Sequence, residues 1–317
     1  MQLLQCPRAV MQRPRPRASR HRARASTVAR AAEAVPAPLA CPICLRPFAL
    51  GAQGGRLCCS SCRRDFPARE FADLTLLSGA GGRYAEGPRP TSTTLFQNPL
   101  ISFAYERGWR SSFAWAGFPG EQAEFEQAQR WLAGAAGGVL LDMSCGSGLF
   151  TRRFANSGAY GHVIGADFSE AMLREAMAQS AAQRTEPGAS QVTLVRADVA
   201  RLPFATASID AVHAGAALHC WPSPSAALAE ISRVLRPGGA FVASTFLDPT
   251  APLGELVGDD AVLPLARVLS ASQSASYRWW NEAELRDLCA LVGLTDFERQ
   301  RTRQFILLRA VKPAGEA

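Results

Sequence analysis

The stretch Val139-Leu-Leu-Asp-Met-Ser-Cys-Gly-Ser-Gly-Leu-Phe150 determines the fold of this chain. Its first half is a short apolar run, which suits a buried strand. Its second half is a turn containing Gly146 and Gly148, where the backbone can bend sharply without a Cβ in the way. A buried strand that passes through such a turn into a helix is typical of an α/β protein with a parallel sheet.

Strand and helix patterns alternate along the rest of the chain. Apolar runs predict further strands at residues 162–167, 192–197, 209–214 and 239–246, and two strand-like runs follow at 295–301 and 304–311. We expect helices to start near Glu121, Ser147, Ser169 and Pro224 and a last helix over 281–292, with Ser169 and Ser223 as N-caps. Gly238 and Gly239 are expected to end the helix that starts at Pro224. The alternation predicts a mostly parallel sheet with helices on both faces.

Composition separates the first 33 residues from the rest. The chain has 317 residues, is 48% hydrophobic and 19% charged, and carries a net charge of +7, which excludes a disordered chain and a small disulfide scaffold. Eight arginines and no acid precede Glu33, so the remainder is close to neutral. An acid-free segment rich in Arg, Ser and Ala predicts an organellar transit peptide at residues 1–33; a basic arm that binds RNA is the alternative. No apolar run is long enough to predict a membrane span.

Three further regions follow the predicted transit peptide. Residues 38–78 contain a cysteine cluster, and residues 79–120 combine a Gly- and Pro-rich linker with an aromatic segment that we interpret as a helical lid. Residues 121–317 form the main domain, with an insertion at 247–280.

Acidic residues follow the predicted strands at three places. Asp142 and Asp167 close the first two strands and Asp198 follows the third, where carboxylates can accept ribose hydroxyls and meet an adenine edge. A dinucleotide fingerprint is excluded because Thr151 stands three residues after Gly148, and no P-loop lysine is present. Asp142 suits a ligand that brings positive charge, such as the amino group and sulfonium of S-adenosylmethionine.

Several longer motifs carry a family resemblance. Residues 142–148 with Asp167, Asp198 and 230–239 resemble the class I S-adenosylmethionine-dependent methyltransferases. LFQNPLISFAYERGWR (95–110), DMSCGSGLF (142–150), VRADVARLPF (195–204) and AGAALHCWPSPS (214–225) resemble the plastid methyltransferases of plants and algae that are associated with plastoglobules and related to quinone-biosynthesis methyltransferases. The resemblance implies a Rossmann-like, seven-stranded sheet and S-adenosylmethionine as cofactor. The cofactor-binding residues it implies are Asp142, Ser144, Gly146, Gly148, Asp167, Phe168, Asp198 and Val199.

Ser144 departs from the family pattern, which usually has glycine there. A serine fits this turn with little strain if its φ is negative, and its hydroxyl is then available for the methionine carboxylate. Composition alone does not separate chloroplast from mitochondrion, whereas the resemblance favours the chloroplast, in the stroma or on plastoglobules. It also implies peripheral attachment to a lipid-droplet surface.

The cysteine cluster has the spacing of a zinc site. Cys41-Pro-Ile-Cys44 and Cys59-Ser-Ser-Cys62 enclose fourteen residues, which predicts a small zinc-ribbon-like module with four thiolate ligands. Cys58 is an alternative ligand to Cys59, and a redox or disulfide role is the alternative function. The cluster also resembles the zinc-binding amino-terminal part of bacterial ribosomal-RNA guanine methyltransferases.

The candidates for the acceptor site are two histidines and a set of apolar residues. His219, in the loop after the fourth strand, is the candidate general base, whereas His213 lies inside the strand and is expected to be buried and hydrogen-bonded. We expect a small, lipophilic acceptor such as a prenylquinone, enclosed by a wall of apolar residues: Phe103, Tyr105, Trp109, Phe113, Trp115, Leu263, Trp279 and Trp280. A ribosomal-RNA base methyltransferase and a non-catalytic scaffold are the alternatives; the near-neutral remainder of the chain after the predicted transit peptide argues against a nucleic-acid partner.

Overall fold

The computed structural model describes residues 38–49, 52–79, 110–182, 186–271 and 278–315. The predicted transit peptide lies outside these residues. So does most of the predicted linker and lid, including Phe103, Tyr105 and Trp109. The described part of the lid begins with the 3-10 helix η2 (Arg110–Ala116).

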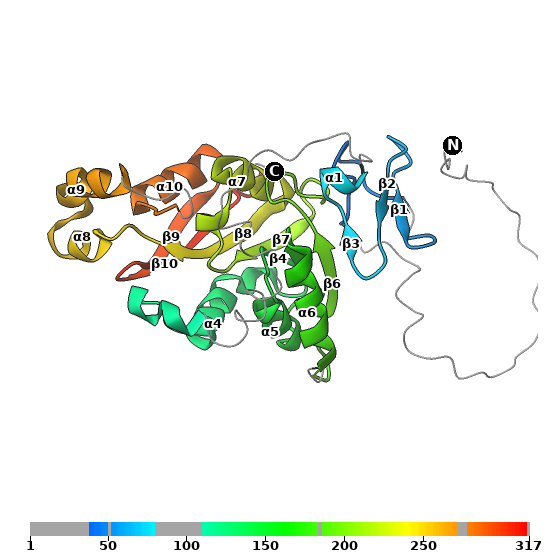
Figure 1. Ribbon diagram of the computed structural model, residues 1–317, viewed down its shortest axis with the longest axis horizontal. Coiled ribbons are helices and arrows are strands. Elements are labelled where there is room, and N and C mark those ends of the chain that lie inside the picture. The colour runs from blue at the N-terminus through cyan, green and yellow to red at the C-terminus, as the bar shows by residue number, and fades with distance from the viewer. Residues whose placement is uncertain (1–37, 50–51, 80–109, 183–185, 272–277, 316–317) are drawn as a thin grey trace, which may run out of the picture.

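An eight-stranded sheet runs through the centre of the molecule (Figure 1). Neighbouring strands are parallel from the edge strand β3 (Ala72–Asp73) as far as β8 (Leu235–Phe246). Strand β10 (Phe305–Val311) is antiparallel to both β8 and β9 (Thr295–Thr302). The full strand order is β3, β6 (Gln191–Arg196), β5 (His162–Asp167), β4 (Val139–Met143), β7 (Ile209–Ala214), β8, β10 and β9. All seven predicted strands are present, and β3 is an additional strand from the cysteine module.

Helices cover both faces of this sheet, as predicted. Leu140 and Leu141 are both fully buried but belong to different apolar clusters, because successive residues of a strand point to opposite faces. The Leu140 cluster includes residues of α4 (Glu121–Trp131) and α5 (Leu149–Asn156). The Leu141 cluster includes residues of α7 (Pro224–Val234) and α10 (Glu282–Leu291).

The helix starts agree with the sequence more closely than the helix ends. Helix α6 (Glu170–Ala182) begins after Ser169, whose Oγ accepts from the Met172 N–H at 3.2 Å. Ser223 stands at the N-cap position of α7, but its side chain makes no capping hydrogen bond. Helix α10 is capped by Asn281, whose side chain accepts from the Ala283 N–H at 2.8 Å.

The prediction that Gly238 and Gly239 end α7 is wrong. Helix α7 ends at Val234, and the next residue already starts β8. The pairing of β8 with β7 shifts register across this stretch, and Gly238 has a φ of 81°. A Cβ on Gly239 would lie 2.8 Å from the Arg236 carbonyl oxygen. The two glycines therefore allow an irregularity within the strand.

The cysteine module packs directly on the sheet. It contains the hairpin β1 (Arg56–Cys58) and β2 (Asp65–Pro67), the edge strand β3 and the short helix α1 (Leu76–Gly79). Buried Phe66 and Leu74 of the module join the same apolar cluster as Val195 and Leu202 of the main domain. Because the connection from β6 to β7 contains no helix, the module supplies cover for this part of the sheet.

The insertion forms two helices at the opposite end of the molecule from the module (Figure 1). These are α8 (Ala251–Val257) and α9 (Asp259–Ala271). Arg301 on β9 joins them to α10, because its guanidinium contacts Asp259 and the buried Glu282. Among the described residues, no helix has the length and apolar character needed to cross a membrane.

Candidate active site

A cavity of about 360 Å³ opens at the carboxyl ends of β4, β5, β7 and β8. One side is polar and is formed by the turns after β4, β5 and β6. The other side is aromatic and is formed by η2, the end of β8 and the segment before α10. The predicted residues that line the polar side are Ser144, Gly146, Asp167, Phe168, Asp198 and Val199.

The turn after β4 uses a left-handed backbone at three positions. Ser144, Gly146 and Gly148 have φ values of 58°, 55° and 80°. The negative φ that would let serine fit this turn with little strain is not adopted, so Ser144 carries strain that glycine would avoid. Its Oγ accepts a hydrogen bond from Trp221 Nε1 at 3.0 Å, which ties the turn to the loop after β7.

The carboxylate of Asp167 is held by the backbone on both sides. Its Oδ2 accepts from the Gly146 N–H at 2.8 Å and its Oδ1 from the Ser169 N–H at 2.7 Å. Burial raises the pKa of Asp167 to about 6; these hydrogen bonds oppose the rise, and the nearby Asp142 adds to it. Each carboxylate oxygen can accept a further hydrogen bond from a ligand hydroxyl.

Asp198 lies on the same side of the cavity. Its Oδ1 accepts from the Ala200 N–H at 2.9 Å, which closes a tight turn just after β6. Asp167 and Asp198 are thus brought together as predicted, with Phe168 and Val199 providing apolar surface beside them. Two carboxylates and a flanking apolar surface suit a nucleoside with a free ribose.

Asp142 does not line the cavity. It is 1% exposed, and its two oxygens are bonded to other side chains, Oδ2 to the Thr151 hydroxyl at 2.5 Å and Oδ1 to His213 Nδ1 at 2.8 Å. His213 is fully buried, as predicted, and its Nε2 has no hydrogen-bond partner within the described part of the chain. Its ring would meet a Cβ placed on Gly215, a cavity residue. Any effect of Asp142 on a ligand in the cavity is therefore indirect and is transmitted by His213 and Gly215.

Gly148 is also absent from the cavity lining. It is the N-cap of α5, and a Cβ there would lie 3.0 Å from the Ala176 Cβ on α6. The structure thus uses this glycine for the helix start and for close packing of α5 against α6.

Phe246, at the end of β8, is the centre of the aromatic side. Its ring packs edge-on against Phe113 at 5.1 Å, stacks on Trp115 at 6.5 Å and contacts Trp279 at 6.1 Å between centroids. Phe246 is not among the residues predicted to enclose the acceptor, although an aromatic residue at the end of a fifth parallel strand is a usable signal. Two residues predicted to enclose the acceptor lie elsewhere: Trp280 is buried in the core and Leu263 does not line the cavity.

His219 lines the cavity beside Phe246. It sits in the 3-10 helix η4 (Leu218–Cys220), is 7% exposed and lines the cavity. Its Nδ1 is 3.3 Å from Thr245 Oγ1, and its ring packs edge-on against Phe246 at 5.0 Å. The imidazole is thus held in one orientation at the cavity wall.

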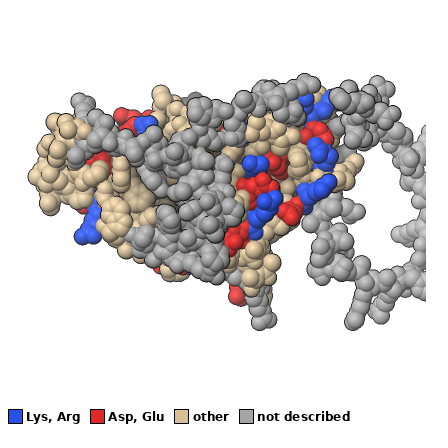
Figure 2. All heavy atoms as spheres, viewed as in Figure 1, with Lys and Arg blue, Asp and Glu red and all other residues tan. Residues whose placement is uncertain are grey.

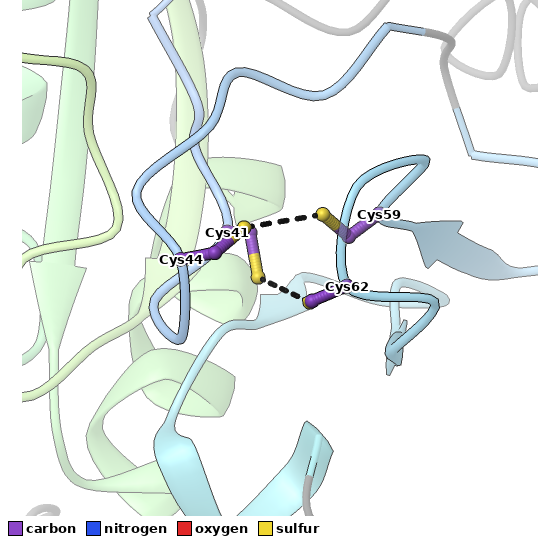
Figure 3. A group of neighbouring side chains, drawn as sticks. All are labelled: Cys41, Cys44, Cys59 and Cys62. Carbon is purple, nitrogen blue, oxygen red and sulfur yellow. Dashed lines mark hydrogen bonds between the residues drawn. The ribbon is translucent and has the colours of Figure 1, made fainter.

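The four predicted zinc ligands form a single cluster (Figure 3). The sulfur atoms of Cys41, Cys44, Cys59 and Cys62 all lie within 4.8 Å of one another, and Cys58 is not part of the group. In each knuckle the residue after the second cysteine is left-handed: Leu45 has a φ of 58° and Arg63 a φ of 60°. The backbone N–H of both residues donates to the carbonyl of the first cysteine of its knuckle. Two matching knuckles with converging thiols fit a tetrahedral zinc ion.

Local contacts shift the pKa values of the cysteine thiols in different directions. Burial opposes ionisation of Cys44, but the Arg46 N–H and the neighbouring thiols lower its pKa to about 7. Burial raises the pKa of Cys41 and that of Cys59. A bound cation would stabilise all four thiolates.

Comparisons with known proteins agree with this architecture. A family model described as a methyltransferase domain matches residues 141–243. The chain is 46% identical over 290 residues to an uncharacterized chloroplastic methyltransferase of Arabidopsis thaliana, covering 87% of this chain and 79% of the relative. It is 35% identical over 231 residues to the demethylmenaquinone methyltransferase of Clavibacter sepedonicus, covering 69% of this chain and 85% of the relative.

A solved structure supports the fold. A Haloferax volcanii complex of the Trm112 methyltransferase activator with a methyltransferase matches with a TM-score of 0.51 and 19% identity, covering 72% of this chain and all of the matched chain. Because the Arabidopsis relative is nearly half identical over most of its length and the family model spans the strands around the cavity, this chain belongs to the class I S-adenosylmethionine-dependent methyltransferases.

Proposed function

We propose that this enzyme methylates a small, lipophilic acceptor such as a prenylquinone in the chloroplast. The observation that carries the proposal is the aromatic lining of the cavity: Phe113, Trp115, Phe246 and Trp279 line the same cavity as the two carboxylates. Such a wall excludes water and stacks on a flat ring. The names of the relatives support it, since one is a chloroplastic methyltransferase and another is a demethylmenaquinone methyltransferase.

The polar side would hold S-adenosylmethionine. We assign the ribose hydroxyls to Asp167 and the adenine to Asp198, with Phe168 and Val199 against the adenine faces. Gly146 and Ser144 would lie along the methionine part, because their left-handed backbone brings the turn close to the cavity. Asp142 and Gly148 would not contact the cofactor, but they would support the site by fixing the positions of His213 and of the start of α5. Bound there, the cofactor supplies an electrophilic methyl group on its sulfonium.

His219 is the proposed general base. In a hydroquinone acceptor, a ring hydroxyl would give its proton to Nε2 of the imidazole. The resulting oxyanion makes its own oxygen or the adjoining ring carbon the nucleophile, which would bond to the methyl carbon as the methyl–sulfur bond breaks and S-adenosylhomocysteine leaves. The contact of Nδ1 with Thr245 orients the ring for this role. We expect His219→Gln to lower kcat about 100-fold while leaving the affinity for S-adenosylhomocysteine unchanged.

The cysteine cluster is proposed to hold a structural zinc ion through Cys41, Cys44, Cys59 and Cys62. The convergence of the four sulfur atoms supports this assignment. Zinc content of the purified protein is expected to be one ion per chain, and Cys44→Ser is expected to lose it. A metal-free protein of unchanged stability would refute the assignment.

We also propose that the insertion rests on a lipid surface, with residues 1–33 directing the chain to the chloroplast. The exposed apolar residues of α8 and α9 support the first part; Leu256 is 83% and Val268 70% exposed. Figure 2 shows mostly uncharged surface at this end of the molecule. The test is flotation with galactolipid vesicles, which Leu256→Glu should abolish without changing cofactor binding. Import of a fluorescent protein fused to residues 1–33 tests the targeting.

The acceptor is tested by methyl transfer. Labelled S-adenosylmethionine would be incubated with the enzyme and either a chloroplast lipid extract or plastid RNA, with Asp167→Ala as control. Label in a quinone fraction supports the proposal. Label in RNA would instead favour the ribosomal-RNA methyltransferase. Figure 2 argues against RNA for the face it shows, where basic side chains lie among acidic ones.

A further inference from the structure

The loop that presents Asp198 to the cavity also holds the first cysteine knuckle. We infer that Arg201 is a positioning residue that couples the metal site of the cysteine module to the adenine end of the cofactor cavity. This inference rests on the proposed roles of Asp198 and of the four cysteines.

Two N–H groups of the Arg201 guanidinium donate hydrogen bonds to the first cysteine knuckle, residues 41–44. Its Nε donates to the Pro42 carbonyl at 2.6 Å and its Nη2 to the Ile43 carbonyl at 2.9 Å. Both carbonyls belong to the two residues between Cys41 and Cys44. The planar fork of an arginine fixes two acceptors at once, which a lysine cannot do.

The same residue closes the turn of Asp198 through its backbone. The Arg201 N–H donates to the Asp198 carbonyl at 2.9 Å, while the Ala200 N–H donates to Asp198 Oδ1 at 2.9 Å. Asp198 and Val199 line the cavity. Arg201 therefore connects a cavity wall and a metal knuckle over three residues of chain.

The surrounding contacts strengthen this connection. The Ala40 N–H donates to the Pro203 carbonyl at 2.8 Å, and the Ala205 N–H donates to the Pro38 carbonyl at 2.9 Å. On the other side, the Leu202 N–H donates to Glu230 Oε2 at 2.7 Å. The helix-free connection between β6 and β7 is thus held between α7 and the cysteine module.

Metal binding determines whether the knuckle can serve as an anchor. The two carbonyls that Arg201 grips keep their direction only while Cys41 and Cys44 are fixed by a common ion, because such short segments take their folding energy from the metal. Loss of the ion would release Arg201 and widen the range of positions open to the Asp198 turn. We expect weaker binding at the adenosine end of the cofactor, with the polypeptide still folded around its sheet.

The test measures binding of 5′-methylthioadenosine, which lacks the methionine carboxylate and amino group, to the full chain by calorimetry. Four proteins are compared, each loaded with zinc and then stripped by a chelator: wild type, Arg201→Gln, Arg201→Lys and the control Arg130→Gln. Arg130 donates to Gln127 on the same exposed helix surface. Zinc content and thermal unfolding are recorded for every sample, and Asp198→Ala is measured beside them.

We expect stripping to weaken wild-type binding about tenfold and Arg201→Gln to weaken it by a similar factor while retaining zinc. Stripping Arg201→Gln should then add little, because both changes remove the same connection. The affinity of Arg201→Lys should fall between those of the zinc-loaded wild type and Arg201→Gln. Arg130→Gln should bind as the wild type does. If Arg201→Gln retains full affinity, or if stripping and substitution add independently, the coupling is refuted. If Asp198→Ala has no effect, the adenine assignment itself is wrong.

Discussion

The raised pKa of Asp167 makes cofactor affinity depend on pH. Burial, reinforced by the charge of Asp142, raises the pKa of this carboxyl to about 6 in the free protein. Ribose hydroxyls donate hydrogen bonds to the ionised carboxylate, so ligand binding favours the charged form and lowers this pKa. Affinity must therefore rise with pH until the free protein is fully ionised.

The size of the effect follows from the pKa. With a value of about 6, roughly one free protein in eleven is ionised at about pH 5 and nine in ten at about pH 7, so affinity should differ about tenfold. Cys145 and Cys220 also face Asp167, but burial raises the pKa of both thiols, that of Cys220 to about 12, and they stay neutral throughout.

Calorimetric titration with 5′-methylthioadenosine between about pH 5 and pH 7.5 measures this dependence. The ligand carries both ribose hydroxyls and lacks the methionine amino group. Asp167→Asn is the matched control, since it keeps the size of the side chain and cannot ionise; it should bind weakly and equally at every pH. An equal slope in the asparagine variant would assign the titration to another group, and a flat wild-type profile would remove Asp167 from the ribose site.

Three other changes test separate parts of the structure. Arg301→Met should lower the free energy of unfolding by about 3 kcal/mol in urea denaturation, because it leaves the buried carboxylate of Glu282 with fewer partners; an unchanged midpoint would contradict this. Ser144→Ala keeps the left-handed strain but loses the hydrogen bond from Trp221, so it should be less stable by about 1 kcal/mol than Ser144→Gly, which loses the bond and relieves the strain. Trp115→Ala should raise the KM for a quinone acceptor about tenfold without changing S-adenosylhomocysteine affinity, since the 58% exposed ring belongs to the aromatic wall alone; equal loss of both would show that the ring supports the whole cavity.

The central part of the fold was predictable because burial and periodicity agree there. Strands β4, β5 and β7 have the predicted bounds, since each is an apolar run with both faces covered. The edge strand β3 is only two residues long and gives no periodic signal, so the eighth strand was not predictable. The irregular start of β8 was hidden for a related reason: a glycine pair after a helix also matches a helix end.

The acids show why some of the predicted site residues line the cavity and others do not. Asp167 is the last residue of β5 and Asp198 lies two residues beyond the end of β6, and both line the cavity at the carboxyl ends of the strands. Asp142 is the fourth of the five residues of β4, still within the alternation, and it follows Leu140 toward the α5 face. There it bonds His213, which is 71 residues away in the sequence and adjacent only because β4 and β7 pair in parallel. Asp142, one residue before the end of its strand, therefore acts through His213, which lies beneath the cavity residue Gly215. Asp167 and Asp198, at or beyond the ends of their strands, line the cavity itself.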